Sequence, residues 1–85
     1  MDYIHFAPRW KEELVATSKS GKLVFEFTMG VEHVYFPSKE LWEKQAPDWA
    51  KDKWEEYMKA CTNWSESNRY PMSIVDNTFM YELKE

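Results

Sequence analysis

Several residue types are scarce in this chain of 85 residues, and each scarcity excludes a class of protein. A single cysteine, Cys61, cannot form an internal disulfide, whereas small secreted domains usually carry several. The longest apolar run is three residues, far short of the roughly 20 that a transmembrane helix needs. The N-terminus also lacks the basic start and the apolar stretch of a signal peptide. We therefore expect a cytoplasmic protein that does not bind membranes.

Positive charge is scarce as well. Lys and Arg together number 11 against 15 Asp and Glu, which gives a formal net charge of -4. Binding to nucleic acid or to an anionic membrane depends on a basic surface. We therefore expect no direct binding to nucleic acid.

Aliphatic residues are few, and aromatic residues take their place. Leu, Ile and Val together number 11, whereas Trp, Tyr and Phe number 15, five of each. One buried ring removes about 150–250 Å² from water. The length allows one domain, so we predict a single domain over residues 1–85 whose core consists mainly of rings.

The segment 14–29 carries the clearest local signal, that of a β-hairpin. A polar loop over 18–21 ends in glycine and separates two β-prone runs. The second run alternates apolar and polar residues, as a half-buried strand does. Residues 8–17 fit either a strand or a helix that opens at Pro8, and we prefer the strand because the second run needs a partner. Further short strands are predicted at 3–6 and 33–36.

Two consecutive helices are predicted after the strands. The first covers about residues 39–46, with Ser38 as a favourable N-cap. The second begins at Pro47, since proline is favoured at the first position of a helix. Its apolar residues recur every three or four positions and form one stripe that should be buried: Ala50, Trp54, Tyr57, Cys61 and Trp64.

The last residues return to strand character. Two β-prone runs, 71–75 and 78–83, flank Asp76-Asn77, a pair that predicts a tight hairpin. The predicted order is β-β-β-α-α-β(-β), and this grouping is typical of an α+β fold. We predict a small antiparallel sheet of three to five strands with the two helices packed on one of its faces.

No catalytic constellation can be assembled from these residues. Cys61 is the only thiol, and its place on the apolar stripe predicts a buried structural residue. A metal site needs three or four ligands close together, and the chain has no C-x-x-C or H-x-x-x-H spacing. We expect no enzyme, no metal and no cofactor. A minimal enzyme that pairs Cys61 with His33 is the least favoured alternative.

Adjacent carboxylates are read as solvated surface. Glu12-Glu13 and Glu55-Glu56 are neighbours in sequence, which is the wrong spacing to converge on one substrate. Acidic residues after Pro47 could imitate nucleic acid and block a protein that binds it. Lysines are interleaved with them, however, and Lys59 lies four residues from Glu55, so mutual neutralisation fits better.

Three aromatic side chains fall outside the faces that should be buried. Trp49 lies on the flank of the apolar stripe, Leu41 can face the core in place of Trp42, and Tyr70 follows the helical segment. Exposed Trp and Tyr are favoured anchors at protein interfaces. We predict Trp42, Trp49 and Tyr70 as binding residues. The alternative packs Trp42 and Trp49 against each other across Pro47, or under the strands.

These observations predict a small, soluble, non-catalytic domain that binds another protein through exposed aromatics on an acidic surface. Two alternatives stay open. One is an inhibitor or immunity-type antagonist that acts as an acidic mimic, and the other is a small-molecule or peptide-binding module with an aromatic-lined site. An edge strand could also pair two copies into a homodimer.

Overall fold

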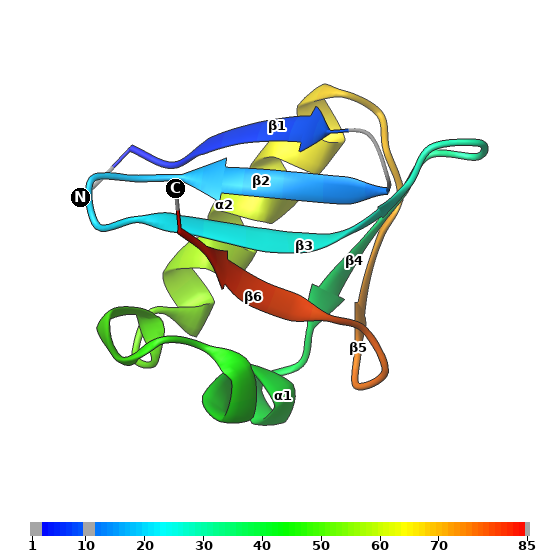
Figure 1. Cartoon of the computed structure of the whole chain (residues 1–85). Coiled ribbons are helices and arrows are strands. Elements are labelled where there is room, and N and C mark those ends of the chain that lie inside the picture. The colour runs from blue at the N-terminus through cyan, green and yellow to red at the C-terminus, as the bar shows by residue number, and fades with distance from the viewer. Residues whose placement is uncertain (1–2, 10–11, 85) are drawn as a thin grey trace.

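The computed structural model describes residues 3–9 and 12–84, and in these residues it shows an α+β fold with a six-stranded mixed sheet and two α-helices (Figure 1). The strands are β1 (His5–Arg9), β2 (Glu13–Thr17), β3 (Lys22–Thr28), β4 (His33–Pro37), β5 (Met72–Val75) and β6 (Met80–Leu83). The helices are α1 (Lys39–Gln45) and α2 (Trp54–Ser67), with a 3₁₀ turn, η1 (Asp48–Ala50), between them.

Strand β3 is the centre of the sheet because it pairs with three others. β2 lies antiparallel along one of its edges, and β6 and β4 share the other edge, β6 along Lys22–Phe25 and β4 along Glu26–Thr28. β1 extends the sheet beyond β2, and β5 extends it beyond β4 in parallel. The α+β class is confirmed, but the sheet has more strands than predicted and is mixed instead of antiparallel.

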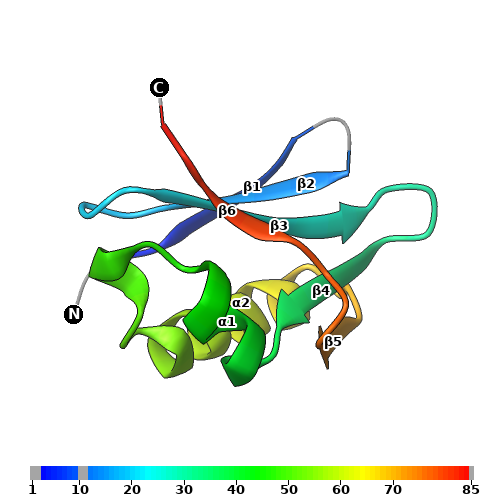
Figure 2. The ribbon, with the colours of Figure 1, turned by 60° about the horizontal axis from the view of Figure 1, so that its bottom comes forward.

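Both helices lie on one face of the sheet (Figure 2). Side chains alternate across each strand, so every second residue of β2, β3 and β4 points toward the helices. The core between the two layers is rich in rings, as predicted. It comprises Phe6, Leu14, Ala16, Leu23, Phe25, Phe27, Val34, Phe36, Trp42, Ala46, Ala50, Tyr57, Cys61 and Met80.

The preference for strand over helix is confirmed at residues 13–17, but the interval 8–17 is not one strand, because residues 8–9 belong to β1 and residues 13–17 form β2. β1 and β2 pair antiparallel, with Phe6 opposite Ala16 and Arg9 opposite Glu13. Pro8 is tolerated because β1 has only one neighbouring strand and lies at the edge of the sheet. The predicted interval 8–17 includes residues 10 and 11, which lie outside the described residues.

The loop between β2 and β3 depends on a glycine. Ser18 N donates to Gly21 O at 2.9 Å and closes the loop. Gly21 has φ +154°, a conformation that side chains rarely allow. A Cβ added here would also lie 2.8 Å from Cζ2 of Trp49. The position therefore requires glycine both for its backbone angle and for the ring packed on it.

Helix α1 is confirmed, but the second helix begins later than predicted. Leu41 N donates to Ser38 Oγ at 3.2 Å, so Ser38 is the N-cap of α1. Pro47 opens only the η1 turn, and α2 starts at Trp54. The indole of Trp42 donates to the carbonyl of Ala50 at 2.8 Å, and Lys53 N donates to the same oxygen at 2.9 Å. These two bonds occupy the carbonyl that a continuous helix would use for residue 54.

The predicted terminal hairpin is wrong. β5 pairs in parallel with β4, and β6 crosses to pair with β3, so the two final strands do not pair with each other. Asp76-Asn77 belongs to the connection between them. Main-chain bonds outside the ladder, Val34 N to Pro71 O and Ser38 N to Val75 O, both 2.9 Å, hold β5 along β4.

Candidate functional site

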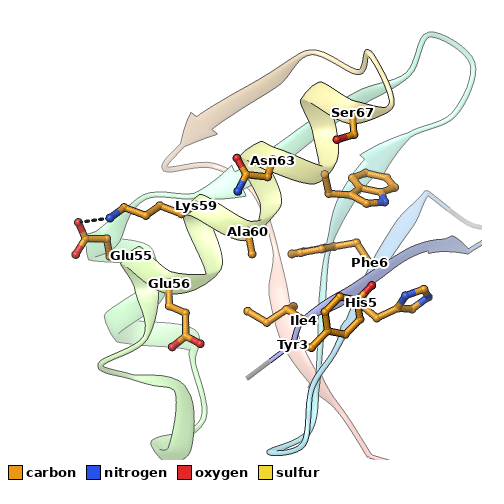
Figure 3. A pocket seen from close by; sticks show the side chains of 11 residues that line it. Tyr3, Ile4, His5, Phe6, Glu55, Glu56, Lys59, Ala60, Asn63 and Ser67 are labelled. Atoms are coloured by element: carbon orange, nitrogen blue, oxygen red, sulfur yellow. Dashed lines mark ion pairs between the residues drawn. The ribbon is translucent and has the colours of Figure 1, made fainter. Parts of the chain in front are cut away.

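An open groove with a volume of about 960 Å³ lies between α2 and residues 3–6 (Figure 3). One wall is the segment that leads into β1, and the other is one side of α2. The lining residues are Tyr3, Ile4, His5, Phe6, Glu55, Glu56, Lys59, Ala60, Asn63, Trp64 and Ser67.

The spacing of short or polar residues along α2 explains why the groove is open. Glu56, Ala60, Asn63 and Ser67 recur at intervals of four, three and four, which places them on one side of the helix. Only Ala60 stands opposite Ile4 and Phe6 at the middle of this row, and its methyl group is too short to close the gap (Figure 3). The floor of the groove is therefore apolar.

Trp64 gives the groove an aromatic wall with a free polar group. Its ring contacts Phe6, Phe27 and Tyr70, with centroid distances of 5.9, 6.3 and 5.5 Å. Three aromatic contacts fix its orientation, yet within residues 3–9 and 12–84 its indole N–H has no acceptor. Trp64 lines the groove, and a tryptophan ring held in place is a suitable contact for a ligand.

The charged end of the groove is acidic. Lys59 forms an ion pair with Glu55, N to O 3.6 Å, and both side chains turn away from the groove (Figure 3). Glu56 points along the groove, and no described residue forms an ion pair with it. Among the described residues, nothing compensates this negative charge, whereas the predicted neutralisation by lysine holds for Glu55.

Trp42, the first of the three predicted binding residues, is not available to a partner. Its side chain is completely buried, stacked on Phe25 and Phe36 at 6.1 and 5.7 Å. The prediction of an exposed anchor is wrong here because the Ala50 carbonyl supplies an internal acceptor for the indole. The buried indole N–H is satisfied, so the whole side chain can enter the core.

Trp49 is half-buried and occupied by internal contacts. Its indole donates to Glu82 Oε2 at 3.0 Å, and its ring lies over Gly21 and near Tyr57, centroid distance 6.5 Å. Trp49 therefore ties the η1 turn to β6 and to the β2–β3 loop. No ring contact joins Trp49 to Trp42, so the two do not pack against each other. The other form of the alternative, packing under the strands, is confirmed for Trp42, which stacks on Phe25 and Phe36.

Tyr70 is also half-buried, and it supports the groove from behind. Its ring packs on Phe27 at 5.3 Å and on Trp64 at 5.5 Å. The structure does not bring the three predicted residues together on one surface. Trp42 lies in α1 and Trp49 in η1, so both belong to the joint between the helices, residues 42–54. Tyr70 lies just after the C-terminal end of α2.

The least favoured alternative, an enzyme with a Cys61–His33 pair, has no support in the geometry. Cys61 is fully buried in the core beneath the sheet, and burial raises the pKa of its thiol to about 12. His33 lies on the opposite face of the sheet, where its Nε2 is 2.8 Å from Ser73 Oγ. A protonated thiol with no histidine beside it is not a nucleophile at neutral pH.

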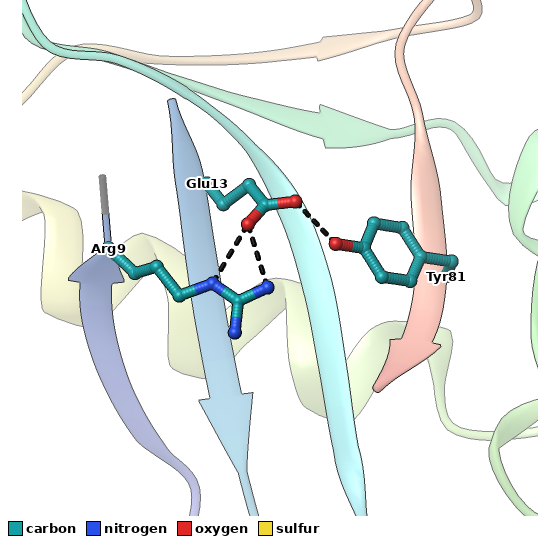
Figure 4. A network of polar contacts seen from close by, with 3 residues as sticks. All are labelled: Arg9, Glu13 and Tyr81. Carbon is teal, nitrogen blue, oxygen red and sulfur yellow. Dashed lines mark hydrogen bonds and ion pairs between the residues drawn. The ribbon is translucent and has the colours of Figure 1, made fainter. Parts of the chain in front are cut away.

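The open face of the sheet carries a polar cluster of Arg9, Glu13 and Tyr81 (Figure 4). Arg9 donates from Nε and pairs through a second nitrogen with Glu13 Oε1, each at 2.8 Å, and the Tyr81 hydroxyl donates to Glu13 Oε2. The bond to Glu13 raises the pKa of Tyr81. Glu13 stands directly opposite Glu26 in the sheet, so this cluster offsets a cross-strand repulsion. The prediction that Glu13 is plain solvated surface is wrong.

The described residues contain no group of three or more His, Cys, Asp or Glu side chains that could hold a metal ion. Nor does any described helix have the length and apolar character to cross a membrane. The acidic-mimic alternative loses part of its basis, because Asp48 and Asp52 precede α2 and do not extend its surface.

The groove residues were not predicted from the sequence. Trp64 was assigned to the buried stripe of α2, and Glu56 to solvated surface. One signal was present in the sequence: Ala60 lies midway along a row of short or polar residues beside a tryptophan. Assigning that row to a groove requires knowing that β1 runs past it.

Comparison with known proteins gave no match: no protein-family model, no curated protein and no solved structure is significantly similar to the chain.

Proposed function

We propose that this chain is a small, non-catalytic binding domain whose partner is another protein, and that the partner binds in the groove between β1 and α2. The observation that carries the proposal is the fixed Trp64 ring, whose indole N–H has no acceptor in the described part of the chain. The apolar floor beside it would be covered by an apolar side chain of the partner.

Filling the groove tests the proposal. Ala60→Arg places a long side chain over the floor, while Cys61, the next residue, keeps its place in the core. Ser20→Arg is the matched control, since it adds the same side chain in the exposed β2–β3 loop. Tagged wild type and both variants are used to isolate partners from an extract of the native host, and each partner is then purified and its Kd measured by calorimetry.

We expect the wild type and Ser20→Arg to bind the same protein with similar Kd, and Ala60→Arg to bind it at least about ten-fold more weakly. All three chains should unfold at similar urea concentrations. A partner that binds Ala60→Arg as tightly as the wild type would place the binding surface elsewhere and contradict the proposal.

A small molecule in the same groove is a second candidate, supported by the volume of about 960 Å³, which is within the range of ligand pockets. Its test is a change in tryptophan fluorescence with a panel of metabolites. A response in the wild type that is absent in Ala60→Arg, together with no protein partner, would favour this candidate over the first.

A further inference from the structure

The peptide groups of β1 can be assigned directions from the pattern of its neighbours. In an antiparallel sheet, the N–H and C=O of successive residues point alternately to the strand on one side and the strand on the other. Phe27 N donates to Glu12 O across β2 and β3, so the peptide group of Glu12 faces β3 and that of Glu13 faces β1. Arg9 is the partner of Glu13 in the register and therefore faces β2.

The same alternation continues to the start of β1. His5 and Ala7 face β2 together with Arg9, so the N–H and C=O of Phe6 and the C=O of Pro8 point away from the sheet. β1 is an edge strand, and no described backbone group bonds to Phe6 on that side. Pro8 has no N–H to offer. Phe6 is thus the position of β1 where an outward donor and an outward acceptor occur together.

Phe6 is also a wall of the groove. A chain that bonded to the outward groups of Phe6 would run along β1 and over the row of short or polar residues on α2. Its side chains would alternate, and every second one would point toward Ala60 and Trp64. The unused backbone edge and the unused apolar groove therefore face the same volume.

One end of the groove differs from the rest of it by carrying an unpaired negative charge among the described residues. Glu56 points along the groove without an ion-pair partner in the described residues, whereas the adjacent Glu55 is paired with Lys59. A cation next to Glu56 would restore neutrality at that end. The chain has a net charge of -4, which favours approach of a basic segment.

We infer that the groove takes an extended peptide segment of a partner protein, which adds to β1 as a further strand at Phe6, inserts apolar side chains beside Ala60 and Trp64, and places a Lys or Arg next to Glu56. This inference rests on the proposed function. A second copy of the chain fits less well, because in its β1 the arginine, Arg9, is already paired with Glu13.

The test uses a displayed library of random ten-residue peptides, selected on the wild type with Ala60→Arg as the counter-selection. We expect enriched peptides to alternate apolar residues with others and to carry a basic residue at one end. One enriched peptide is then synthesised with a single N-methyl group at each position in turn. Methylation removes an N–H donor, so it should weaken binding at least about ten-fold at the two positions, two residues apart, whose N–H groups bond to the outward carbonyls of Phe6 and Pro8, and the peptide methylated between them should bind nearly as the parent does.

Two further measurements use the chain itself. The amide proton of Phe6 should exchange with solvent more slowly when the parent peptide is bound. Glu56→Gln should weaken the peptide about two- to five-fold, and Glu55→Gln, the matched change at the neighbouring paired carboxylate, should weaken it less.

The outcomes separate the two proposals. Peptides that need the open groove but show no alternation on methylation, and leave the Phe6 amide unprotected, would overturn strand addition and leave the proposed function standing. Selection that yields no peptide sensitive to Ala60→Arg would overturn the inference, and the proposed function would then be judged on the captured protein. A concentration-dependent dimer of the wild type that Ala60→Arg abolishes would also overturn it, with a second copy as the occupant.

Discussion

The tryptophans at the joint between the helices and the tryptophan at the far end of α2 differ in the fate of their indole N–H groups. Trp42, Trp49 and Trp54 each donate to a defined acceptor, at 2.8, 3.0 and 2.9 Å. Trp64 has equally close aromatic neighbours but no acceptor in the described part of the chain. Trp42, Trp49 and Trp54 therefore stabilise contacts within the fold, whereas the indole N–H of Trp64 has no such internal role among the described residues.

This comparison shows that exposure of a ring is not the only sign of a binding residue. A buried indole that lacks an acceptor is costly, so an indole that ends without one must face solvent or a ligand. Trp64 meets this condition, and it lines the groove between α2 and residues 3–6. Trp42, Trp49 and Trp54 do not meet this condition, because each indole has an acceptor, although Trp42 and Trp49 are two of the predicted binding residues.

The largest effect on stability is expected at Trp42. Trp42→Ala removes a fully buried ring that stacks on Phe25 and Phe36, and it should lower the free energy of unfolding by about 3–5 kcal/mol. Urea denaturation followed by circular dichroism measures the loss. A domain of this size has only about 4–13 kcal/mol in total, so the variant should be close to unfolding. A loss below about 1 kcal/mol would contradict the role of Trp42 as a core residue that stabilises the fold.

Gly21→Ala tests the contact between the joint and the β2–β3 loop. The backbone angle of +154° and the Trp49 ring both oppose a methyl group, so we expect a loss of about 1–3 kcal/mol. Part of this cost should disappear in the background of Trp49→Ala, because the ring is then absent. Strictly additive losses in the double variant would mean that Trp49 does not press on Gly21 in solution.

The sequence predicts those elements whose determinants are local. Alternation over 22–28 predicts β3, and Ser38 predicts the start of α1, because strand faces and N-caps depend on residues a few positions apart. The start of α2 depends on the bond from Trp42 to the Ala50 carbonyl, which joins residues in different elements. Nothing local to residue 50 indicates it.

The same reason explains the errors in the sheet and in the site. Asp76-Asn77 has the composition of a hairpin turn, but β4 and β3 offer free edges to β5 and β6, and pairing with distant strands wins. Helical periodicity places Trp64 correctly on the inner side of α2. It does not reveal that β1 passes beside that end of the helix and leaves a groove there.

The pH dependence of the unfolding free energy tests whether the core around Cys61 excludes water. In the folded chain its thiol pKa is raised to about 12, against an ordinary value of 9.0. Below pH 9 the thiol is protonated in both states, and stability is unaffected. Between pH 9 and about 12 only the unfolded chain loses the proton, so unfolding should become easier by up to about 1.4 kcal/mol per pH unit.

Cys61→Ala separates this effect from other groups that titrate at high pH. The variant should lack the contribution of the thiol, so the difference in unfolding free energy between wild type and variant should shrink as the pH rises from 9 to 11. A difference that stays constant over this interval would show that the thiol ionises in the folded chain, and the core at Cys61 would then be open to water.

The smallest effect on stability is expected at Trp64, where the comparison is most direct. Trp64→Phe keeps an aromatic ring against Phe6 and Tyr70 and removes an N–H that has no internal acceptor, so the loss should be below about 1 kcal/mol. Trp42→Phe is the matched control, and it should lose more because it leaves the Ala50 carbonyl without its indole donor. Acrylamide quenching gives an independent readout: Trp64→Phe should remove an accessible component of the fluorescence, and Trp42→Phe a protected one. Equal losses of stability and equal changes in quenching would mean that the two indoles are in equivalent surroundings. The distinction between Trp42 as a structural residue and Trp64 as a proposed binding residue would then be contradicted.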